Sequence, residues 1–220
     1  MAAGAPVGRP IPRLPYTERM TFRAAALAII LFVVGMTQAA PAAGPFGLRF
    51  GMTAAQARVM GAMRVADIPN AYTLRTVPNG NSAFESYSLF ISPTHGLCSV
   101  SGTGPDITND AGGTRTRYAF AGLRATFVSI YGRPTSTEDS LKAGSVYSTE
   151  SDWLTGILLG DRHYTATWDT LDHAKLPASY RSIQLYISPS GRSTGSIAVN
   201  YVTQDSHCLD DIRNADKNGL

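Results

Sequence analysis

The chain has 220 residues, of which 19 are Lys or Arg and 16 are Asp or Glu, so its formal net charge is +3. Four of these basic residues and one acidic residue lie within residues 1–43, which leaves residues 44–220 with 15 of each and no net charge. Because a nucleic-acid-binding domain needs a basic surface, nucleic acid is not an expected partner of residues 44–220.

The segment Ala24–Met36 is an apolar run of thirteen residues without a charge. Arg19 and Arg23 precede it, and the small-residue run Ala-Ala-Pro-Ala-Ala follows at 39–43. This order is typical of a secretory signal peptide, and the run is too short for a spanning helix, which needs about 20 residues. We predict that residues 1–43 are a signal peptide and that residues 44–220 form one domain, periplasmic or secreted from a bacterium. Cleavage is expected after Ala43, with Ala40 and Ala42 as competing sites.

Two alternatives for this segment stay open. Met20 begins a conventional signal by itself, so residues 1–19 are either a start site assigned too early or a long basic leader of the signal. An uncleaved N-terminal anchor helix is the alternative to cleavage. No cysteine precedes Cys98, so a lipoprotein anchor is not expected, and no membrane span is predicted in residues 44–220.

Cys98 and Cys208 are the two cysteines of the chain. In an oxidising compartment, an isolated pair most simply forms a disulfide, whereas in a reducing cytosol the two would be separate buried thiols. The predicted signal peptide favours the disulfide.

The first half of residues 44–220 reads as one helix followed by strands. Thr53 and Gln56 form a capping box that begins a helix near 53–63. The segments 72–77 and 84–91 flank Pro78-Asn79-Gly80, a strong hairpin signal, and 97–100 reads as a third strand. The glycine-rich segment that follows, 102–113, is predicted to be an exposed, mobile loop.

The second half repeats this order of elements. Its predicted helix carries an apolar stripe at i, i+3, i+7, i+10 and i+11, made of Phe120, Leu123, Phe127, Ile130 and Tyr131. A short helix is expected from Ser151, followed by alternating strands at 163–169, 183–188 and 195–203. The predicted fold class is α+β, with helices packed on one face of an antiparallel sheet.

Two short matches indicate a tandem helix–sheet repeat. Leu89-Phe90-Ile91-Ser92-Pro93 matches Leu185-Tyr186-Ile187-Ser188-Pro189, and Phe46-Gly47-Leu48-Arg49 matches Phe120-Ala121-Gly122-Leu123-Arg124. If the repeat is real, each half contributes a helix and then its strands to one sheet.

Several motifs resemble those of small exported bacterial α+β proteins. Gly-Met-Thr-x-x-Gln at 51–56, the helix end Tyr-Gly-Arg-Pro at 131–134, and the closing strands 183–185 and 197–201 after Trp168 carry the resemblance. The architecture is similar to that of SmpA/OmlA-type outer-membrane assembly lipoproteins and of secreted beta-lactamase inhibitor proteins. This resemblance implies an envelope or inhibitor-like binding role, and it carries over no functional residue. The missing lipid-anchor cysteine departs from the first family.

No motif predicts a catalytic, cofactor-binding or metal-binding residue, and no cofactor is expected. The histidines His95, His163, His173 and His207 lack zinc-site spacing, and no G-x-S-x-G or phosphate-binding loop occurs. The remaining candidates are tyrosines, which are enriched at binding surfaces but are also common in strands. They are Tyr72, Tyr87, Tyr118, Tyr180 and Tyr186.

These observations predict a non-catalytic module that binds a macromolecule, either a protein or an envelope component, through one sheet face or the loop 102–116. The alternative is an exported hydrolase whose active site assembles only in three dimensions. A third possibility is a purely structural envelope protein.

Overall fold

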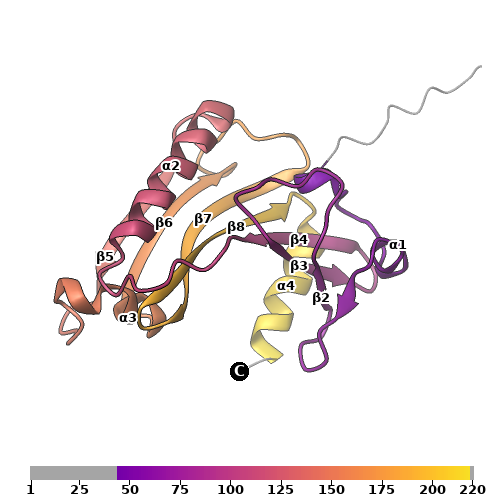
Figure 1. The fold of residues 1–220 in the computed structure, drawn as a ribbon. Helices are drawn as coiled ribbons and strands as arrows, with labels where there is room; N and C mark the ends of the chain where they lie inside the picture. Colours follow the sequence, from indigo (N-terminus) through magenta and orange to yellow (C-terminus); the bar gives the residue numbers. More distant parts are fainter. Residues whose placement is uncertain (1–43, 219–220) are drawn as a thin grey trace, which may run out of the picture. The chain divides into compact units, whose positions relative to one another are not determined.

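The computed structural model describes residues 44–218 of the chain (Figure 1). The predicted signal peptide and its cleavage site after Ala43 therefore lie outside the described residues. Within them, eight strands form one antiparallel sheet and helices pack against it, which confirms the predicted α+β class.

The elements follow one another in the order of two similar halves. The first half contains the short helices η1 (Pro45–Gly47) and α1 (Ala54–Val59) and the strands β1 (Met63–Arg64), β2 (Ala71–Leu74), β3 (Ser86–Ser92) and β4 (Gly96–Thr103). The second half contains α2 (Thr114–Tyr131), β5 (Ser136–Leu141), η2 (Glu150–Asp152), α3 (Trp153–Leu158), β6 (Arg162–Asp169), β7 (Tyr180–Gly191) and β8 (Thr194–Thr203). The helix α4 (Ser206–Asn218) ends the described chain.

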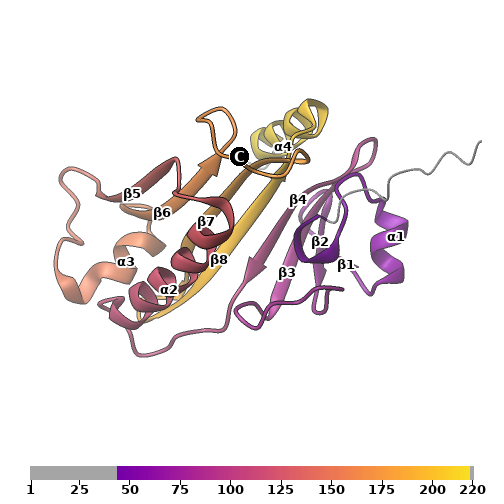
Figure 2. The same ribbon diagram turned by 90° about the horizontal axis from the view of Figure 1, so that it is seen from above.

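The strand order is symmetric about the contact between β4 and β8. It runs β1-β2-β3-β4-β8-β7-β6-β5, so each half contributes four neighbouring strands and the halves meet through their fourth strands (Figure 2). Leu89 in β3 pairs with Val100, and Leu185 in β7 pairs with Val199, so the first sequence match falls on equivalent strands. The second match does not, because Phe46 lies in η1 whereas Phe120 lies in the middle of α2.

The hydrophobic core lies between one face of the sheet and the helices α1, α2 and α3. Alternate residues of the central strands, such as Val100, Ile183, Leu185 and Val199, are fully buried on this face. The partly buried ring of Phe46 packs against this core, 4.8 Å from the Tyr87 ring and 5.4 Å from the Tyr201 ring. This close packing leaves no room for a side chain at position 102, where a Cβ would lie 2.9 Å from the Phe46 ring.

The helix α2 begins six residues earlier than the apolar stripe predicts. Asp110 caps its first turn, because one carboxylate oxygen accepts the Arg115 N–H at 3.1 Å and the other accepts the Thr116 N–H at 2.8 Å. On its sheet-facing side, Phe120 and Phe127 are buried as predicted, but Ile130 is 63% exposed and lies outside the core. The helix therefore buries a narrower stripe than the sequence suggests and not a shorter one, because Tyr131 still packs against the core.

The segment 102–116 is not the free loop that its composition predicts. Gly102 and Thr103 belong to β4, Ile107 forms a bridge to Gly195, and Asp110 is buried beneath the start of α2. Asp110 accepts backbone N–H groups at the start of α2, so this part of the segment is fixed to the fold.

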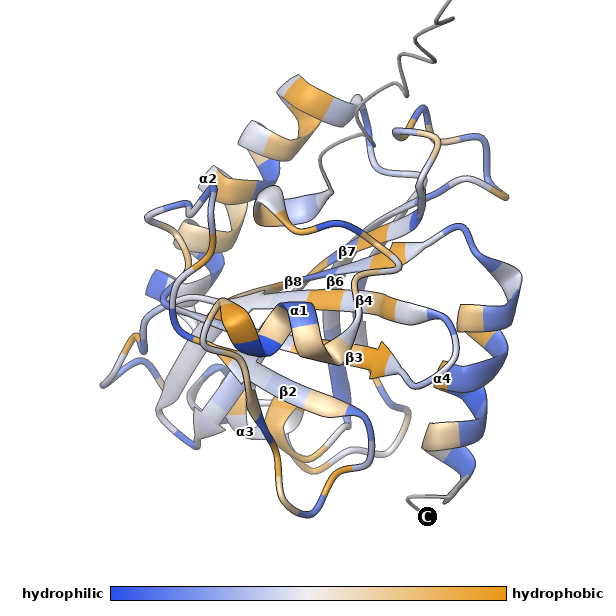
Figure 3. Ribbon diagram, turned by 90° about the vertical axis from the view of Figure 1, so that its right-hand side faces the viewer, coloured by the Kyte–Doolittle hydropathy of each residue, from blue (hydrophilic) through white to orange (hydrophobic). Residues whose placement is uncertain are grey.

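The helix α4 lies on the side of the sheet opposite α2 (Figures 2 and 3). It contacts β3 and β4 near the turn that joins them and leaves the rest of that face without a covering helix. None of the helices in residues 44–218 combines the length and the apolar character needed to cross a bilayer.

Candidate functional site

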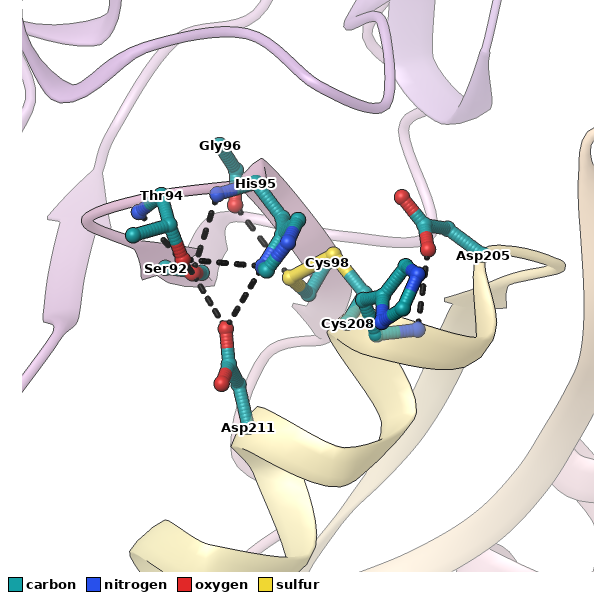
Figure 4. Close-up of polar contacts among 9 residues, drawn as sticks. Ser92, Thr94, His95, Gly96, Cys98, Asp205, Cys208 and Asp211 are labelled. Atoms are coloured by element: carbon teal, nitrogen blue, oxygen red, sulfur yellow. Dashed lines mark hydrogen bonds and ion pairs between the residues drawn. A yellow bond between two sulfur atoms is a disulfide. The ribbon is translucent and has the colours of Figure 1, made fainter.

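One gathering of polar side chains is the attachment of α4. Ser92 Oγ donates to Asp211 Oδ2 at 2.5 Å, and His95 Nδ1 lies 3.0 Å from the same oxygen (Figure 4). The Cys98–Cys208 disulfide joins β4 to α4 beside this cluster, which confirms the predicted bond. The disulfide indicates an oxidising compartment.

The residues Ser92, His95 and Asp211 do not have the geometry of a hydrolase triad. In a triad the histidine lies between the serine and the carboxylate, but here the serine and the histidine both contact one carboxylate oxygen. Ser92 is 2% exposed, and its Oγ also accepts the backbone N–H groups of Thr94 and His95. The cluster therefore closes a turn and fastens a helix, and it offers no accessible nucleophile.

The two histidines at this attachment do not form a metal site. The rings of His95 and His207 stack at 5.3 Å with an interplanar angle of 14°, so their nitrogen lone pairs do not converge. No group of three or more His, Cys, Asp or Glu side chains in the described part of the chain is placed to hold a metal ion. The hydrogen bonds from Ser92 and His95 lower the pKa of Asp211, which favours the carboxylate that anchors the helix.

The predicted tyrosines divide between core and surface. Tyr72, Tyr87 and Tyr180 are buried, so these three are core strand residues and not part of a binding surface. Burial raises the pKa of Tyr180 to about 12, with a further contribution from Tyr131. Tyr118 is 84% exposed on α2, and Tyr186 is half-buried on the face of the sheet that faces away from α2.

The second gathering of polar side chains is an unbroken row across this same face. The strand register pairs Thr73 with Ser88, Ser88 with Ser101, Ser101 with Asn200, Asn200 with Gln184, Gln184 with Thr167, and Thr167 with Ser136. We call these seven residues the polar row: Thr73, Ser88, Ser101, Asn200, Gln184, Thr167 and Ser136.

The polar row is uncharged and accessible. Each of its side chains is half-buried or exposed, and each bears a hydroxyl or an amide. Ser101 Oγ donates to Asn200 Oδ1 at 3.0 Å, so the two residues at the centre of the row are hydrogen-bonded across β4 and β8. With strands spaced by about 4.8 Å, the row spans roughly 30 Å from β2 to β5.

Two aromatic residues flank the polar row at equivalent positions of the two halves. Phe90 on β3 and Tyr186 on β7 both lie two residues beyond a member of the row and point to the same face. Burial raises the pKa of Tyr186, and a hydrogen bond with Ser101 offsets part of that shift. The face thus combines a central line of neutral polar groups with two partly exposed rings.

The four histidines do not all lie together at this face or at any other single site. His163 is exposed on the same face as the polar row, at the outer end of β6, and His173 lies in the turn after β6 with a φ of 69°. The neighbouring acids Glu138 and Asp139 lie in β5 and pair with Thr165 and Tyr164, so they point to opposite faces of the sheet.

Sequence reasoning missed the polar row because the row exists only across strands. No two of its members in different strands are linked by a recognisable spacing, since the turn lengths between strands differ. A signal was nevertheless present within single strands: Ser99, Ser101 and Thr103 alternate with buried residues, and so do Ser86 and Ser88. Aligning the strands by these alternations would have suggested a polar face.

The chain matches no family model, no curated protein and no solved structure in the three comparisons made. The resemblance to assembly lipoproteins and inhibitor proteins therefore stays a prediction.

Proposed function

We propose that this protein is an exported module that acts by binding a partner protein through the face that carries the polar row. The single observation that supports this proposal most strongly is the continuity of the row across both halves of the sheet. A face that merely needed solvation would tolerate charged side chains at any of these positions. Instead, the seven members are all neutral hydrogen-bonding residues.

The chemistry of the face favours a neutral polar protein surface as the occupant. The cores of protein interfaces are depleted in charged residues, and they carry about one hydrogen bond per 100–200 Å². The polar row and the flanking rows of Phe90 and Tyr186 cover roughly 30 Å by 15–20 Å. Because side chains make the surface uneven, its accessible area is larger than this flat estimate. The accessible area therefore approaches the roughly 800 Å² per partner of a standard interface.

The disulfide supports an extracytoplasmic site of action, because such bonds form and persist in oxidising compartments. The proposed export signal in residues 1–43 would deliver the chain there. We therefore place the partner in the bacterial periplasm or outside the cell.

Site-specific photo-cross-linking tests the proposal. The photoreactive residue p-benzoylphenylalanine would replace Gln184, an exposed member of the polar row, in the protein expressed from its full sequence in a bacterial host that exports it. The matched control carries the same residue in place of Tyr118, which is an aromatic side chain 84% exposed on α2. We expect a discrete protein adduct from position 184 and none from position 118.

The cross-linked peptide identifies the kind of occupant. A peptide rich in neutral polar residues supports the proposal, whereas a second copy of this chain or a polysaccharide adduct contradicts it. Equal cross-linking from positions 184 and 118 would mean that the face has no special role.

A further inference from the structure

The strand β5 forms one edge of the sheet and pairs with a neighbour on one side alone (Figure 2). It pairs with β6 over all six residues without a shift of register, and all but one of its residues are exposed. At the other edge of the sheet, β1 spans two residues. An edge strand of this length, without a bulge or a proline, can pair with a strand from another chain.

The hydrogen-bond pattern shows which backbone groups of β5 face outward. In an antiparallel pair, residues that bond across the pair alternate with residues that point away from it. The Lys142 N–H donates to the Asp161 carbonyl at 2.7 Å in the register of β5 and β6, so residues 140, 138 and 136 also bond to β6. No backbone hydrogen bond within residues 44–218 is made by the three residues that point outward, which are Thr137, Asp139 and Leu141.

A hollow of about 490 Å³ lies beside the start of β5 and carries positive charge. Its lining includes Arg124 and Val128 of α2, Arg133, and the chain as far as Thr137. Neither arginine forms an ion pair with another residue of the described chain, and α2 contains no acidic residue. The hollow therefore favours a carboxylate over a cationic side chain.

A side chain of an added strand would stand next to this hollow. Thr137 points to the face that the helices cover, because it pairs with the buried Ala166. The residue of an added strand directly opposite Thr137 lies about 4.5–5.5 Å from it on the same face. Since Thr137 lines the hollow, an Asp or Glu at that position can pair with Arg124 or Arg133.

The next residue of β5 sets the opposite preference on the other face. Glu138 points to the face of the polar row, because side chains alternate along a strand, and it forms no ion pair with another described residue. A Lys or Arg opposite Glu138 in an added strand would therefore be favoured. Asp139 differs, because its carboxylate already lies 3.6 Å from Arg162.

A second copy of β5 does not meet this pattern. Antiparallel pairing of two β5 strands along their full length through the outward residues places Glu138 or Asp139 opposite the same residue of the other copy. Like charges directly opposite each other destabilise such a pair.

We propose that the outer edge of β5 binds an extended segment of another protein as a further antiparallel strand. The segment carries an acidic residue beside the hollow and a neighbouring basic residue opposite Glu138. This inference goes beyond the proposed function and does not depend on the polar row, because the binding groups lie at the side of the sheet and not on its face.

A peptide of sequence Thr-Val-Lys-Glu-Val-Thr with blocked ends is the probe, and amide hydrogen exchange measured by nuclear magnetic resonance is the readout. In the oxidised protein without peptide, the amides of Glu138 and Ser140 should be protected, whereas those of Thr137 and Asp139 should exchange freely. Addition of the peptide should protect Thr137 and Asp139, with saturation below about 1 mM. The alternation within one strand is the internal control.

A peptide with Lys in place of Glu tests the charge preference. It should bind at least about tenfold more weakly, because a cation then lies beside the two arginines. The double variant Arg124→Glu, Arg133→Glu should reverse this order, so that the peptide with two lysines binds more tightly than the original one. Both substitutions are at exposed positions.

Thr137→Pro tests the backbone hydrogen bond itself. The substitution removes an N–H that points outward and takes no bond from β6, and proline is tolerated on an edge strand in this orientation. Peptide binding should weaken by about tenfold or more, whereas Thr137→Val, which keeps the N–H, should bind within about twofold of the unmodified protein. If Thr137→Pro fails to fold, the exchange of charges at Arg124 and Arg133 still decides.

Four results would overturn the inference. They are the absence of saturable protection at Thr137 and Asp139 up to about 1 mM peptide, equal affinity of the unmodified protein for both peptides, and shifts of the arginine side chains without protection of these amides. The fourth is protection that rises with protein concentration when no peptide is present, which would assign the edge to a second copy of this chain. None of these results affects the adduct expected from position 184, so the proposed function is tested separately.

Discussion

The contrast between Phe127 and Ile130 tests the packing of α2 most sharply. The apolar stripe in the sequence treats the two as equivalent, but Phe127 is 4% exposed and Ile130 is 63% exposed. The Phe127 ring lies 5.6 Å from the Trp168 ring and 5.8 Å from the Tyr131 ring. These contacts would be lost on truncation to alanine.

The expected magnitudes follow from these positions. Phe127→Ala should lower the free energy of unfolding by about 3–5 kcal/mol, because the change removes a buried ring and leaves a cavity. Ile130→Ala should change it by less than about 1 kcal/mol, because most of this side chain already contacts water and alanine favours a helix. Arg124→Ala, at an exposed position of the same helix, should stay within about 0.5 kcal/mol.

Urea titration at neutral pH, with the protein kept oxidised, measures all three variants. An unchanged m value would show that each variant unfolds from the same compact state. Equal losses for Phe127→Ala and Ile130→Ala would refute the placement of α2 on β7 and β8, since the helix would then present a different side to the sheet.

Three further predictions concern the elements that hold the fold and its face in place. Cys98 and Cys208 should resist thiol alkylation until a reductant is added, and free labelling of the untreated protein would refute the disulfide. The double variant Cys98→Ser, Cys208→Ser should lower the free energy of unfolding by up to about 4–5 kcal/mol, by the loop-entropy model for a separation of 110 residues. Burial raises the pKa of Asp110, but the stronger sum of hydrogen bonds from Thr116 and Arg115 keeps it below its usual value of 3.8. Because the pKa is lowered in the folded state, the Asp110 carboxylate stabilises the fold above pH 3.8, and this stabilisation is lost as the pH falls through the folded-state pKa. Acid titration followed by circular dichroism should therefore show a smaller loss of stability in Asp110→Asn than in the unmodified protein. Gly113→Ala should lower the free energy of unfolding by at least about 2 kcal/mol in thermal unfolding, because φ is +67° and the new Cβ would clash with the buried Trp153 ring. The control Gly160→Ala, with a φ of +74° and open space around its Cβ, should cost about 1 kcal/mol. Equal losses would contradict the packing at Trp153.

The elements that the sequence predicts correctly are those with a periodic apolar pattern and a local start signal. The capping box of Thr53 and Gln56 forms as predicted. The strands β2 and β3 pair with each other as predicted, but the long loop 75–85 joins them in place of a tight Asn-Gly turn. The helix α2 was predicted too short because its cap, Asp110, lies four residues before the first helical residue and outside the usual capping position.

Two elements of the structure were not predicted. The strand β5 is an edge strand with the sequence Ser-Thr-Glu-Asp-Ser-Leu, and nearly all its side chains are exposed, so it lacks apolar alternation. The helix α4 is held by the disulfide and by Asp211 more than by an apolar stripe. Its attachment depends on contacts with residues more than 100 positions earlier in the chain.

The candidate site was even less accessible to sequence reasoning than the fold. The polar row depends on the register of six strand pairs. Only the expectation of a binding role through one sheet face could be stated beforehand. The residues of the binding face could be identified only from the strand register of the structure.

Cross-linking from several members of the polar row tests the central claim most directly. The photoreactive residue would be placed, one position at a time, at Ser88 on β3, Ser101 on β4 and Gln184 on β7, and in the control at Tyr118. If the row is one binding surface, all three positions yield an adduct with the same partner protein, and the control yields none. Adducts with unrelated proteins from the two halves, or an adduct from Tyr118 alone, would contradict the claim.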